Sequence, residues 1–234
     1  MRWSLGFLPI VGVAAGGILF GWQQLARALG AAPLFFGAVA VLLPILIAGG
    51  FHMDGFLDAA DAIFSRRDRE RRLQIMKDPH CGPFAVLCCG GLLLLELGSW
   101  SQLWAKPALL PAACVVFLYS RSLTVVAGSR FPYAATSTLG ALFAGRAARG
   151  VSALSLAETA VSFLLLGGAG WLGGGFPGLL AAGTAGLGGL LLLVWFRRMT
   201  GHTFGGVTGD LLGFFVELSQ MGMLLILAAA SLFL

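Results

Sequence analysis

The sequence predicts an all-α integral membrane protein, a polytopic bundle of transmembrane helices, on three observations. Hydrophobic residues make up 58% of the 234 residues and charged residues only 11%, whereas a soluble domain carries about 25% charged residues. The mean hydropathy is +0.91. Apolar runs of about 17 to 25 residues, long enough to cross a bilayer, recur along the whole chain. No polar linker separates these runs, so we expect a single membrane domain over residues 1–234.

Seven apolar runs are expected to be spans, within a range of six to eight. They lie near residues 5–22, 31–51, 83–104, 108–127, 155–173, 178–196 and 214–234. The fifth run is diluted by glycine and is expected to be tilted or broken.

The distribution of Lys and Arg predicts that the amino terminus is cytoplasmic. If residues 49–83 are cytoplasmic and the spans alternate, twelve basic residues fall inside and only Arg27 and Lys106 fall outside. The polar segments 49–83, 128–154 and 197–213 then share the cytoplasmic face. This arrangement favours an enzyme over a pump or channel. The net charge of +5 reflects these loops and their contact with membrane lipid, and we expect no nucleic-acid partner.

The first acidic cluster lies in the segment 49–83, which holds six of the ten acidic residues. Asp54, Asp58 and Asp61 follow an i, i+4, i+7 spacing, which places them on one face of a helix. Three carboxylates on one face repel each other unless a cation lies among them, and Mg²⁺ prefers oxygen ligands. The alternative is a solvated helix face at the membrane surface. The apolar and glycine neighbours favour a half-buried magnesium site.

Four further residues of this segment are candidates for binding substrate. His52 has either a direct role or a hydrogen-bonding role in the core. Most of the basic run 66–72 is expected to be a solvated loop, but arginines such as Arg66 bind phosphate oxygens bidentately. Lys77 would supply a point charge to a diphosphate. Asp78 is either another ligand or a helix cap.

The second acidic cluster lies in GGVTGDLLGFFVELSQ, residues 205–220. Asp210 and Glu217 are seven residues apart and share one helix face, and glycines such as Gly206 allow a backbone to approach a ligand closely. Glu217 falls inside a span, where an ionisable residue is functional by default. The alternative is a helix start capped at Thr208 or Asp210, followed by a buried, paired Glu217.

Two more charged residues, Glu96 and Arg121, lie inside spans and are expected to pair with each other. Taken together, carboxylates that hold a divalent cation beside cationic phosphate contacts fit transfer across a phosphoanhydride. The donor and the acceptor do not follow from these residues.

Three segments carry a resemblance to a known family. The segment GGFHMDGFLDAADAIFSRRDRERRLQIMKDPHCGPFAVL (49–87) closely resembles a signature of the cobalamin synthase (adenosylcobinamide-GDP ribazoletransferase) family. GGVTGDLLGFFVELSQ is similar to its second signature, and SRSLTVVAGSRFPYAATSTLGALF (120–143) to its central segment. The order and spacing match over essentially the whole chain. The sequence departs from the pattern at PHCGPF after Asp78, at Phe214 and Phe215, and at Ala135 and Thr136, but it loses no acidic position.

The resemblance implies the last assembly step of the cobalamin nucleotide loop. Adenosylcobinamide-GDP would donate its cobinamide phosphate to α-ribazole or α-ribazole 5′-phosphate, giving adenosylcobalamin or its 5′-phosphate and GMP. Mg²⁺ would be required, and the enzyme would be a multi-pass protein of the cell inner membrane with its active site facing the cytoplasm. Self-association, or association with other nucleotide-loop enzymes, is also compatible with this reading.

The resemblance also implies roles for residues that match the signatures. The expected magnesium ligands are Asp54, Asp58, Asp61 and Asp210. Asp61 or Glu217 would accept the proton of the attacking hydroxyl, and Lys77 would steady phosphate oxygens. The expected substrate-binding residues are His52, Arg66, Asp78, Arg130, Gly206 and Thr208.

Two other classes remain as alternatives. A membrane CDP-alcohol-type phosphotransferase also clusters aspartates around Mg²⁺, but it expects DxxDGxxAR followed by GxxxDxxxD, whereas this chain has DGxxDxxD and a distant Asp210. A cation transporter would place acidic residues at mid-membrane in several spans, and only Glu96 and Glu217 qualify here.

Overall fold

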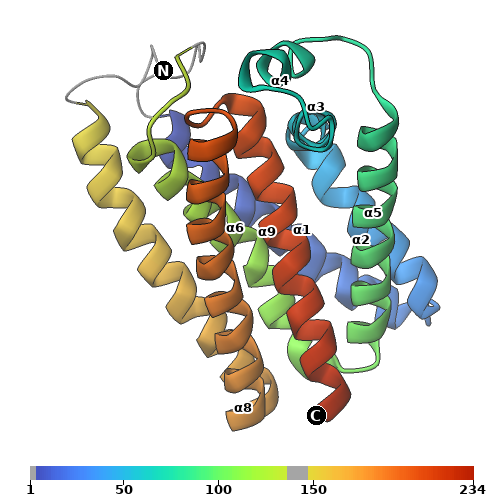
Figure 1. Cartoon of the computed structure of the whole chain (residues 1–234). Coiled ribbons are helices and arrows are strands. Elements are labelled where there is room, and N and C mark those ends of the chain that lie inside the picture. Colours follow the sequence, from blue (N-terminus) through green and yellow to red (C-terminus); the bar gives the residue numbers. More distant parts are fainter. Residues whose placement is uncertain (1–3, 136–146) are drawn as a thin grey trace.

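The computed structural model describes residues 4–135 and 147–234 and shows a bundle of long helices (Figure 1). The isolated bridge between Tyr133 and Val207 is the only β-type pairing in the described part of the chain. The predicted all-α class is therefore confirmed. In chain order the elements are η1 (Ser4–Phe7), α1 (Leu8–Ala28), α2 (Pro33–Ile47), α3 (Phe51–Phe64), α4 (Arg69–Ile75), α5 (Pro83–Trp104), η2 (Pro107–Leu109), α6 (Leu110–Arg130), α8 (Ala147–Thr203), α9 (Gly209–Ala230) and η3 (Ser231–Phe233).

Several helices have the length and composition of membrane spans. Among the described residues, five stretches qualify, or six if α2 and α3 together form one bent span. Many of their large apolar side chains face outward, such as Leu94, Leu164 and Leu191, each at least 70% exposed. Outward apolar side chains are expected where lipid is the solvent. The protein is a multi-pass membrane protein; the exact number of spans stays a prediction.

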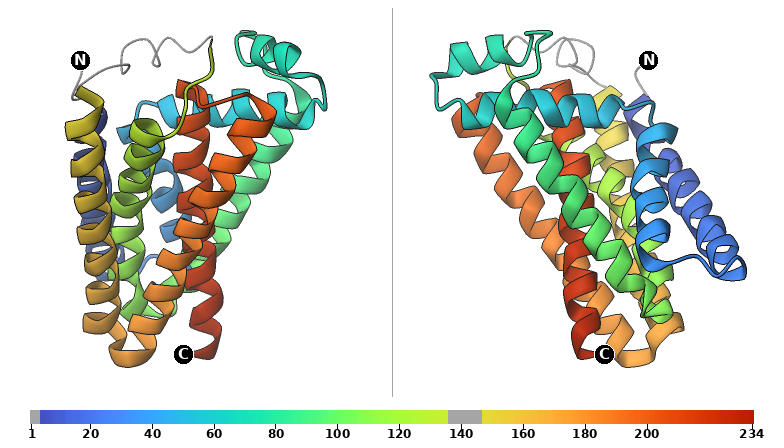
Figure 2. Two further views of the ribbon diagram at one scale, coloured as in Figure 1. Left: turned by 60° about the vertical axis from the view of Figure 1, so that its left-hand side comes forward. Right: turned by 90° about the vertical axis from the view of Figure 1, so that its right-hand side faces the viewer.

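Helix α8 is one continuous element by its hydrogen bonds but two legs in space. The backbone at Gly175 leaves helical geometry with φ of 60° and ψ of −144°, and Pro177 follows. Figures 1 and 2 show the two legs side by side, joined at one end of the bundle. Gly170 and Gly178 face each other so closely that a Cβ on either would clash with the other's carbonyl. The predicted runs 155–173 and 178–196 correspond to these legs.

The chain bends sharply between α2 and α3. The two helices meet at 96° across Gly49 and Gly50, whose φ angles of 61° and 75° are open to glycine at little cost. Helix α3 therefore lies across the end of the bundle instead of along it (Figure 2). Helix α4 and the start of α1 lie at this same end, and the carboxyl terminus lies at the opposite end. Which membrane side each end faces stays a prediction.

Helix α6 forms the centre of the bundle. Almost all of its residues are buried, and α1, α8 and α9 pack around it. Gly12 and Gly16 of α1 lie against the carbonyl oxygens of Phe117 and Cys114. Small residues at such a crossing let helix backbones approach closely, as is usual in membrane bundles. This rigid centre carries α9, which presents Asp210 at the bundle end where α3 lies.

Candidate active site

Glycines bring the two acidic segments together. A Cβ on Gly55 of α3 would lie 2.7 Å from the carbonyl oxygen of Asp210, and one on Gly213 of α9 would lie 3.1 Å from the carbonyl oxygen of His52. Helices α3 and α9 therefore cross in close backbone contact at the two positions that lack a side chain. The crossing joins residues about 150 positions apart in the sequence and sets Asp210 beside the acidic face of α3.

That acidic face lines a cavity of about 240 Å³. Asp54, Asp58 and Asp61 all contribute to its wall, which confirms that their spacing places them on one face. The opposite wall comes from the turn that follows α4, residues 76–81, which includes Lys77 and Asp78. We call this the acidic cavity.

Burial and the neighbouring carboxylates both raise the pKa of Asp58. Burial raises the pKa of Asp58 to about 6, and the neighbouring charges of Asp54, Asp210 and Asp61 add to this effect. Burial raises a carboxyl pKa by disfavouring the charged form, and the like charges of three neighbouring carboxylates act in the same direction. Such a site favours the binding of a cation.

Asp61 has contacts that distinguish it from its two neighbours. Its Oδ2 accepts a hydrogen bond from the backbone N–H of Gly82 at 2.5 Å, and its Oδ1 accepts one from Ala85 at 2.8 Å. These N–H groups belong to the start of α5, where backbone donors lack partners within the helix. Asp61 therefore caps α5 from a distance, and it fixes the start of that helix against α3.

Lys77 and Asp78 also differ in their contacts. Lys77 lies in the cavity wall, and its charge acts on Asp210 as well. Asp78 accepts hydrogen bonds from the backbone N–H of His80 at 3.0 Å and contacts the His80 ring at 2.7 Å. These contacts hold the pKa of Asp78 below its usual range. Lys77 is thus the cation of this wall, and Asp78 shapes the turn.

The loop before α9 joins two of the sequence motifs, the central segment and the second acidic segment. Val207 donates its N–H to the carbonyl of Pro132 at 2.8 Å and accepts from the N–H of Ala134 at 3.0 Å. Gly206, at φ of 145°, lies so close to this strand-like segment that a side chain would collide with it. The Thr208 hydroxyl accepts from the Leu211 N–H at 3.3 Å and so caps α9. Gly206 and Thr208 therefore position Asp210.

A contact that sequence reasoning did not anticipate adds the DRERR motif to this loop. The guanidinium of Arg69, at the start of α4, occupies the space that a side chain on Gly205 would need. Arg69 and Gly205 each belong to a segment that carries the family resemblance. The sequence alone did not predict that these two residues would be in contact. The contact places α4 over the α9 end of the site.

Comparison with known proteins gives the family. The family described as cobalamin-5-phosphate synthase matches residues 1–228. Similar proteins named adenosylcobinamide-GDP ribazoletransferase include one from Lachnoclostridium phytofermentans, 35% identical over 92% of this chain and 79% of that protein. Another, from Pseudomonas paraeruginosa, is 37% identical over 94% of this chain and 84% of its own length. One from Brevibacillus brevis is 32% identical over 98% and 88%.

The chain belongs to the cobalamin-5-phosphate synthase family. No solved structure matches it. The resemblance carried by the two acidic segments is therefore confirmed, and the arrangement above shows how the segments of a family member meet.

Two residues expected to bind substrate lie away from the acidic cavity. His52 is buried under α3, at 8% exposure, and its backbone packs on Gly213. Burial, reinforced by the charge of Arg121, lowers the pKa of His52 to about 4, so its ring is neutral at pH 7. Arg66 is exposed just after α3, with φ of 52°. Its contact with substrate stays a prediction.

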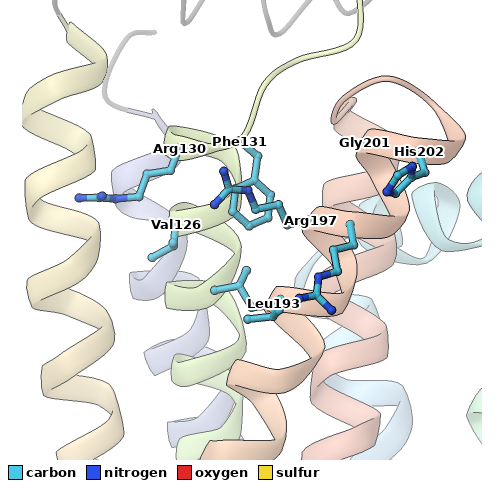
Figure 3. Close-up of a pocket in the computed structure, with 9 residues that line it drawn as sticks. Val126, Arg130, Phe131, Leu193, Arg197, Gly201 and His202 are labelled. Atoms are coloured by element: carbon cyan, nitrogen blue, oxygen red, sulfur yellow. The ribbon is translucent and has the colours of Figure 1, made fainter.

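Arg130 belongs to a second cavity at the same end of the bundle. It lies at the end of α6, and its Nη2 donates to the carbonyl of Ser152 at 3.0 Å. Figure 3 shows it at a pocket formed with Arg197 and His202 of α8. This pocket and the acidic cavity share no lining residue. The part of the central segment after Ala135 lies outside the described residues.

Glu217 is part of a polar cluster inside the bundle. It is only 4% exposed, and Glu96 and Arg121 are each 1% exposed. Gln220 donates to Glu96 Oε1 at 3.0 Å and accepts from Arg121 Nη1 at 2.9 Å. The direct Glu96–Arg121 pair expected from the sequence is therefore wrong; an amide one turn from Glu217 bridges the two, because α9 passes between α5 and α6.

The described residues do not by themselves form a complete set of metal ligands. Across residues 4–135 and 147–234, no three His, Cys, Asp or Glu side chains converge as a ready-made metal site. Asp61 contributes to this result, because both of its oxygens face the start of α5. Mg²⁺, however, needs only one or two carboxylates together with water and substrate phosphates. Asp54 and Asp58 in the cavity wall, with Asp210 beside them, fit that requirement.

Proposed function

We propose that this chain is an adenosylcobinamide-GDP ribazoletransferase that acts at the acidic cavity. The observation that carries the proposal is the convergence of both family signatures at one site: the α3 carboxylates and the start of α9 meet through Gly55 and Gly213. The family match over residues 1–228 supplies the reaction class. The donor is adenosylcobinamide-GDP, and the acceptor is α-ribazole or its 5′-phosphate.

The reaction joins a ribose hydroxyl of the acceptor to the phosphorus that carries the cobinamide. The new phosphorus–oxygen bond forms as the bond from that phosphorus to the GMP oxygen breaks, and the hydroxyl loses one proton. The product is adenosylcobalamin or its 5′-phosphate, and GMP departs. Most catalysis of phosphoryl transfer comes from positioning and from neutralising charge on the phosphate oxygens.

Asp54, Asp58 and Asp210 are the residues that would hold Mg²⁺ with the diphosphate of the donor. When bound, the metal neutralises the charge that develops on the phosphate oxygens. Lys77 adds a fixed positive charge in the cavity wall. Gly206 and Thr208 hold the start of α9, which keeps Asp210 in register with α3.

A carboxylate of the cavity accepts the proton of the attacking hydroxyl. The better candidate by its contacts is whichever of Asp54 and Asp58 does not hold the metal, since Mg²⁺ needs only one or two carboxylates and no hydrogen bond joins either side chain to another group in the described part of the chain. Asp61 uses both oxygens to cap α5, and Glu217 lies two helix turns away inside the bundle. The general base was first expected to be Asp61 or Glu217. We therefore propose a structural role for each of these two residues instead.

The proposed location is the cell inner membrane, with the acidic cavity facing the cytoplasm. The support is the charge distribution. Helices α3 and α4 lie at one end of the bundle (Figure 1), and Arg130, Arg197 and Arg198 line a pocket at the ends of α6 and α8 there (Figure 3). Basic residues collect on the cytoplasmic side of membrane proteins.

The decisive experiment uses the purified full chain in liposomes with adenosylcobinamide-GDP, α-ribazole 5′-phosphate and Mg²⁺, and follows GMP release together with formation of the complete corrinoid. We expect both products in equal amounts, and neither in the presence of EDTA. Folded protein that releases no GMP would contradict the proposal. Activity with a CDP-alcohol donor instead would identify the alternative phosphotransferase, and Mg²⁺ flux across the vesicle would identify a transporter.

A further inference from the structure

The second cavity of the bundle end is large and basic. It has a volume of about 820 Å³ and lies between the end of α6 and the second leg of α8. Its polar wall holds three arginines and a histidine, and the nine described residues that line it include no carboxylate. They are Val126, Arg130, Phe131, Leu193, Val194, Arg197, Arg198, Gly201 and His202. We call this the basic pocket.

Two of the three arginines of the basic pocket, Arg130 and Arg197, contact neighbouring groups. The Arg197 guanidinium lies 5.6 Å from the centre of the Phe131 ring, a cation–π arrangement that Figure 3 shows from the side. Arg130 extends toward the first leg of α8, where it bonds Ser152. A guanidinium has five N–H donors, so each of these contacts leaves donors for an anion. Arginine suits phosphate because it binds two oxygens at once.

The other wall of the basic pocket is apolar and continues along the outside of the bundle. Val126, Leu193 and Val194 line the pocket, and Val194 is 52% exposed. Leu191 and Leu187 follow from Val194 at helical spacing on the same face of α8, and they are 72% and 54% exposed. An apolar strip therefore leads from the arginines toward the opposite end of the bundle.

This combination matches the two parts of a phospholipid. A phosphate would lie among the arginines, and an acyl chain would follow the strip Val194–Leu191–Leu187. Trp195, which follows Val194 in the sequence and is 44% exposed, suits the level of the headgroups, where tryptophan concentrates. Basic pockets between helices on the cytoplasmic side bind anionic headgroups in other membrane proteins. A soluble phosphate ester would contact the arginines alone, whereas a phospholipid, of the kind that covers the strip in any case, would contact both the strip and the arginines.

We propose that the basic pocket binds an anionic phospholipid, with its phosphate on Arg197 and Arg198 and an acyl chain on α8. The general preference for basic residues on the cytoplasmic side explains why arginines are present, but it does not explain why they enclose a pocket of this size. The site is separate from the acidic cavity, so the proposal does not depend on the proposed function.

The test measures lipid bound to the intact protein after extraction from vesicles of equal phosphatidylglycerol and phosphatidylcholine, by native mass spectrometry. We expect the wild type to retain phosphatidylglycerol preferentially. The double variant Arg197→Gln/Arg198→Gln should lose affinity for this lipid roughly 30-fold, about fivefold for each arginine. Arg197→Lys/Arg198→Lys should keep most of the affinity, because the positive charge remains.

The matched control is Arg67→Gln/Arg71→Gln, which removes the same charge from exposed positions near the same end of the bundle. It should bind phosphatidylglycerol as the wild type does. Equal loss in the control and in the pocket variant would overturn the proposal, as would a wild type with no lipid preference. Tighter binding of glycerol phosphate than of phosphatidylglycerol, at matched phosphate concentration, would also overturn it, since the acyl chain would then contribute nothing and a soluble ester would be the occupant.

Discussion

Helix α9 carries two acidic residues on one face, Asp210 and Glu217, and they lie in different surroundings. Asp210 lies at the end of the bundle, beside the acidic cavity and the charges of Asp54 and Lys77. Glu217 lies two turns deeper, among Gln220, Arg121 and Glu96, where almost nothing is exposed. Residues of the same type on the same helix thus serve different purposes because one site opens to the surface and the other is sealed.

The difference follows from how the negative charge of each residue can be neutralised in its surroundings. A buried charge in a membrane protein must be neutralised by partners from the protein itself, and Arg121 with Gln220 provides them for the deep cluster. At the bundle end, the cavity leaves room for a ligand to provide that neutralisation. We therefore expect changes at the acidic cavity to alter turnover and changes at the deep cluster to alter stability.

The largest expected effect is on turnover, from Asp58→Asn. The substitution keeps the shape of the side chain but removes a negative charge from the cavity that would hold the metal and diphosphate. A metal-based contribution of several kcal/mol to the transition state corresponds to a loss of roughly 1,000-fold. GMP release in liposomes measures it, with unfolding followed in parallel. Glu70→Gln, on the exposed side of α4, is the control and should retain full turnover; equal rates for both variants would remove Asp58 from the site.

The next effect is on stability, from Arg121→Met. Removing the arginine leaves the buried Gln220 oxygen without its donor and takes the nearby cation from buried Glu96 and Glu217; a buried polar group left unpaired costs about 1–3 kcal/mol. Equilibrium unfolding of the detergent-solubilised protein measures the change, and Arg121→Lys should recover part of it. The exposed Arg67→Gln should leave the unfolding free energy unchanged. A fully stable Arg121→Met would show that the deep cluster is not held by this residue.

A smaller effect is expected from Gly55→Ala, because its added methyl group would press on the Asp210 backbone. Separation of α3 from α9 by a fraction of an ångström should reduce turnover by roughly 10- to 100-fold. The matched control is Gly98→Ala on α5, where the methyl group meets nothing within 4 Å. If the two variants have equal turnover, the close crossing is not required for catalysis.

The smallest effect separates two roles of Asp61. If Asp61 acts mainly as a cap, Asp61→Asn keeps an oxygen acceptor and most of the turnover, whereas Asp61→Ala lowers the unfolding free energy by about 1 kcal/mol. If Asp61 is instead a metal ligand or the base, Asp61→Asn should lose turnover as severely as Asp58→Asn. Kinetics and unfolding of the two variants, measured side by side, decide between these roles.

Much of the architecture could be predicted because lipid imposes simple rules on sequence. Apolar runs of span length correspond to helices or to the two legs of α8, and the spacing of Asp54, Asp58 and Asp61 placed them correctly on one face. Local periodicity is sufficient for such predictions because it depends only on helix geometry.

The contacts between distant segments could not be predicted in the same way. The Asp61 cap depends on how residues 65–82 fold back over α3, and the bridge through Gln220 depends on the rotation of α9 between α5 and α6. The placement of Arg130 at the basic pocket depends on the second leg of α8, which turns at Gly175. Each contact depends on the docking of whole helices, which no local pattern in a single sequence records.

The crossing of α3 and α9 also determines when the active site can form during synthesis of the protein. Asp54 and Asp58 leave the ribosome early, but Asp210 and Gly213 belong to α9 and follow about 150 residues later. A nascent chain that has inserted the helices before α9 has the walls of the acidic cavity but still lacks Asp210 beside them. Assembly of the site therefore requires the docking of α9, and a chain interrupted before α9 would carry the α3 carboxylates without Asp210.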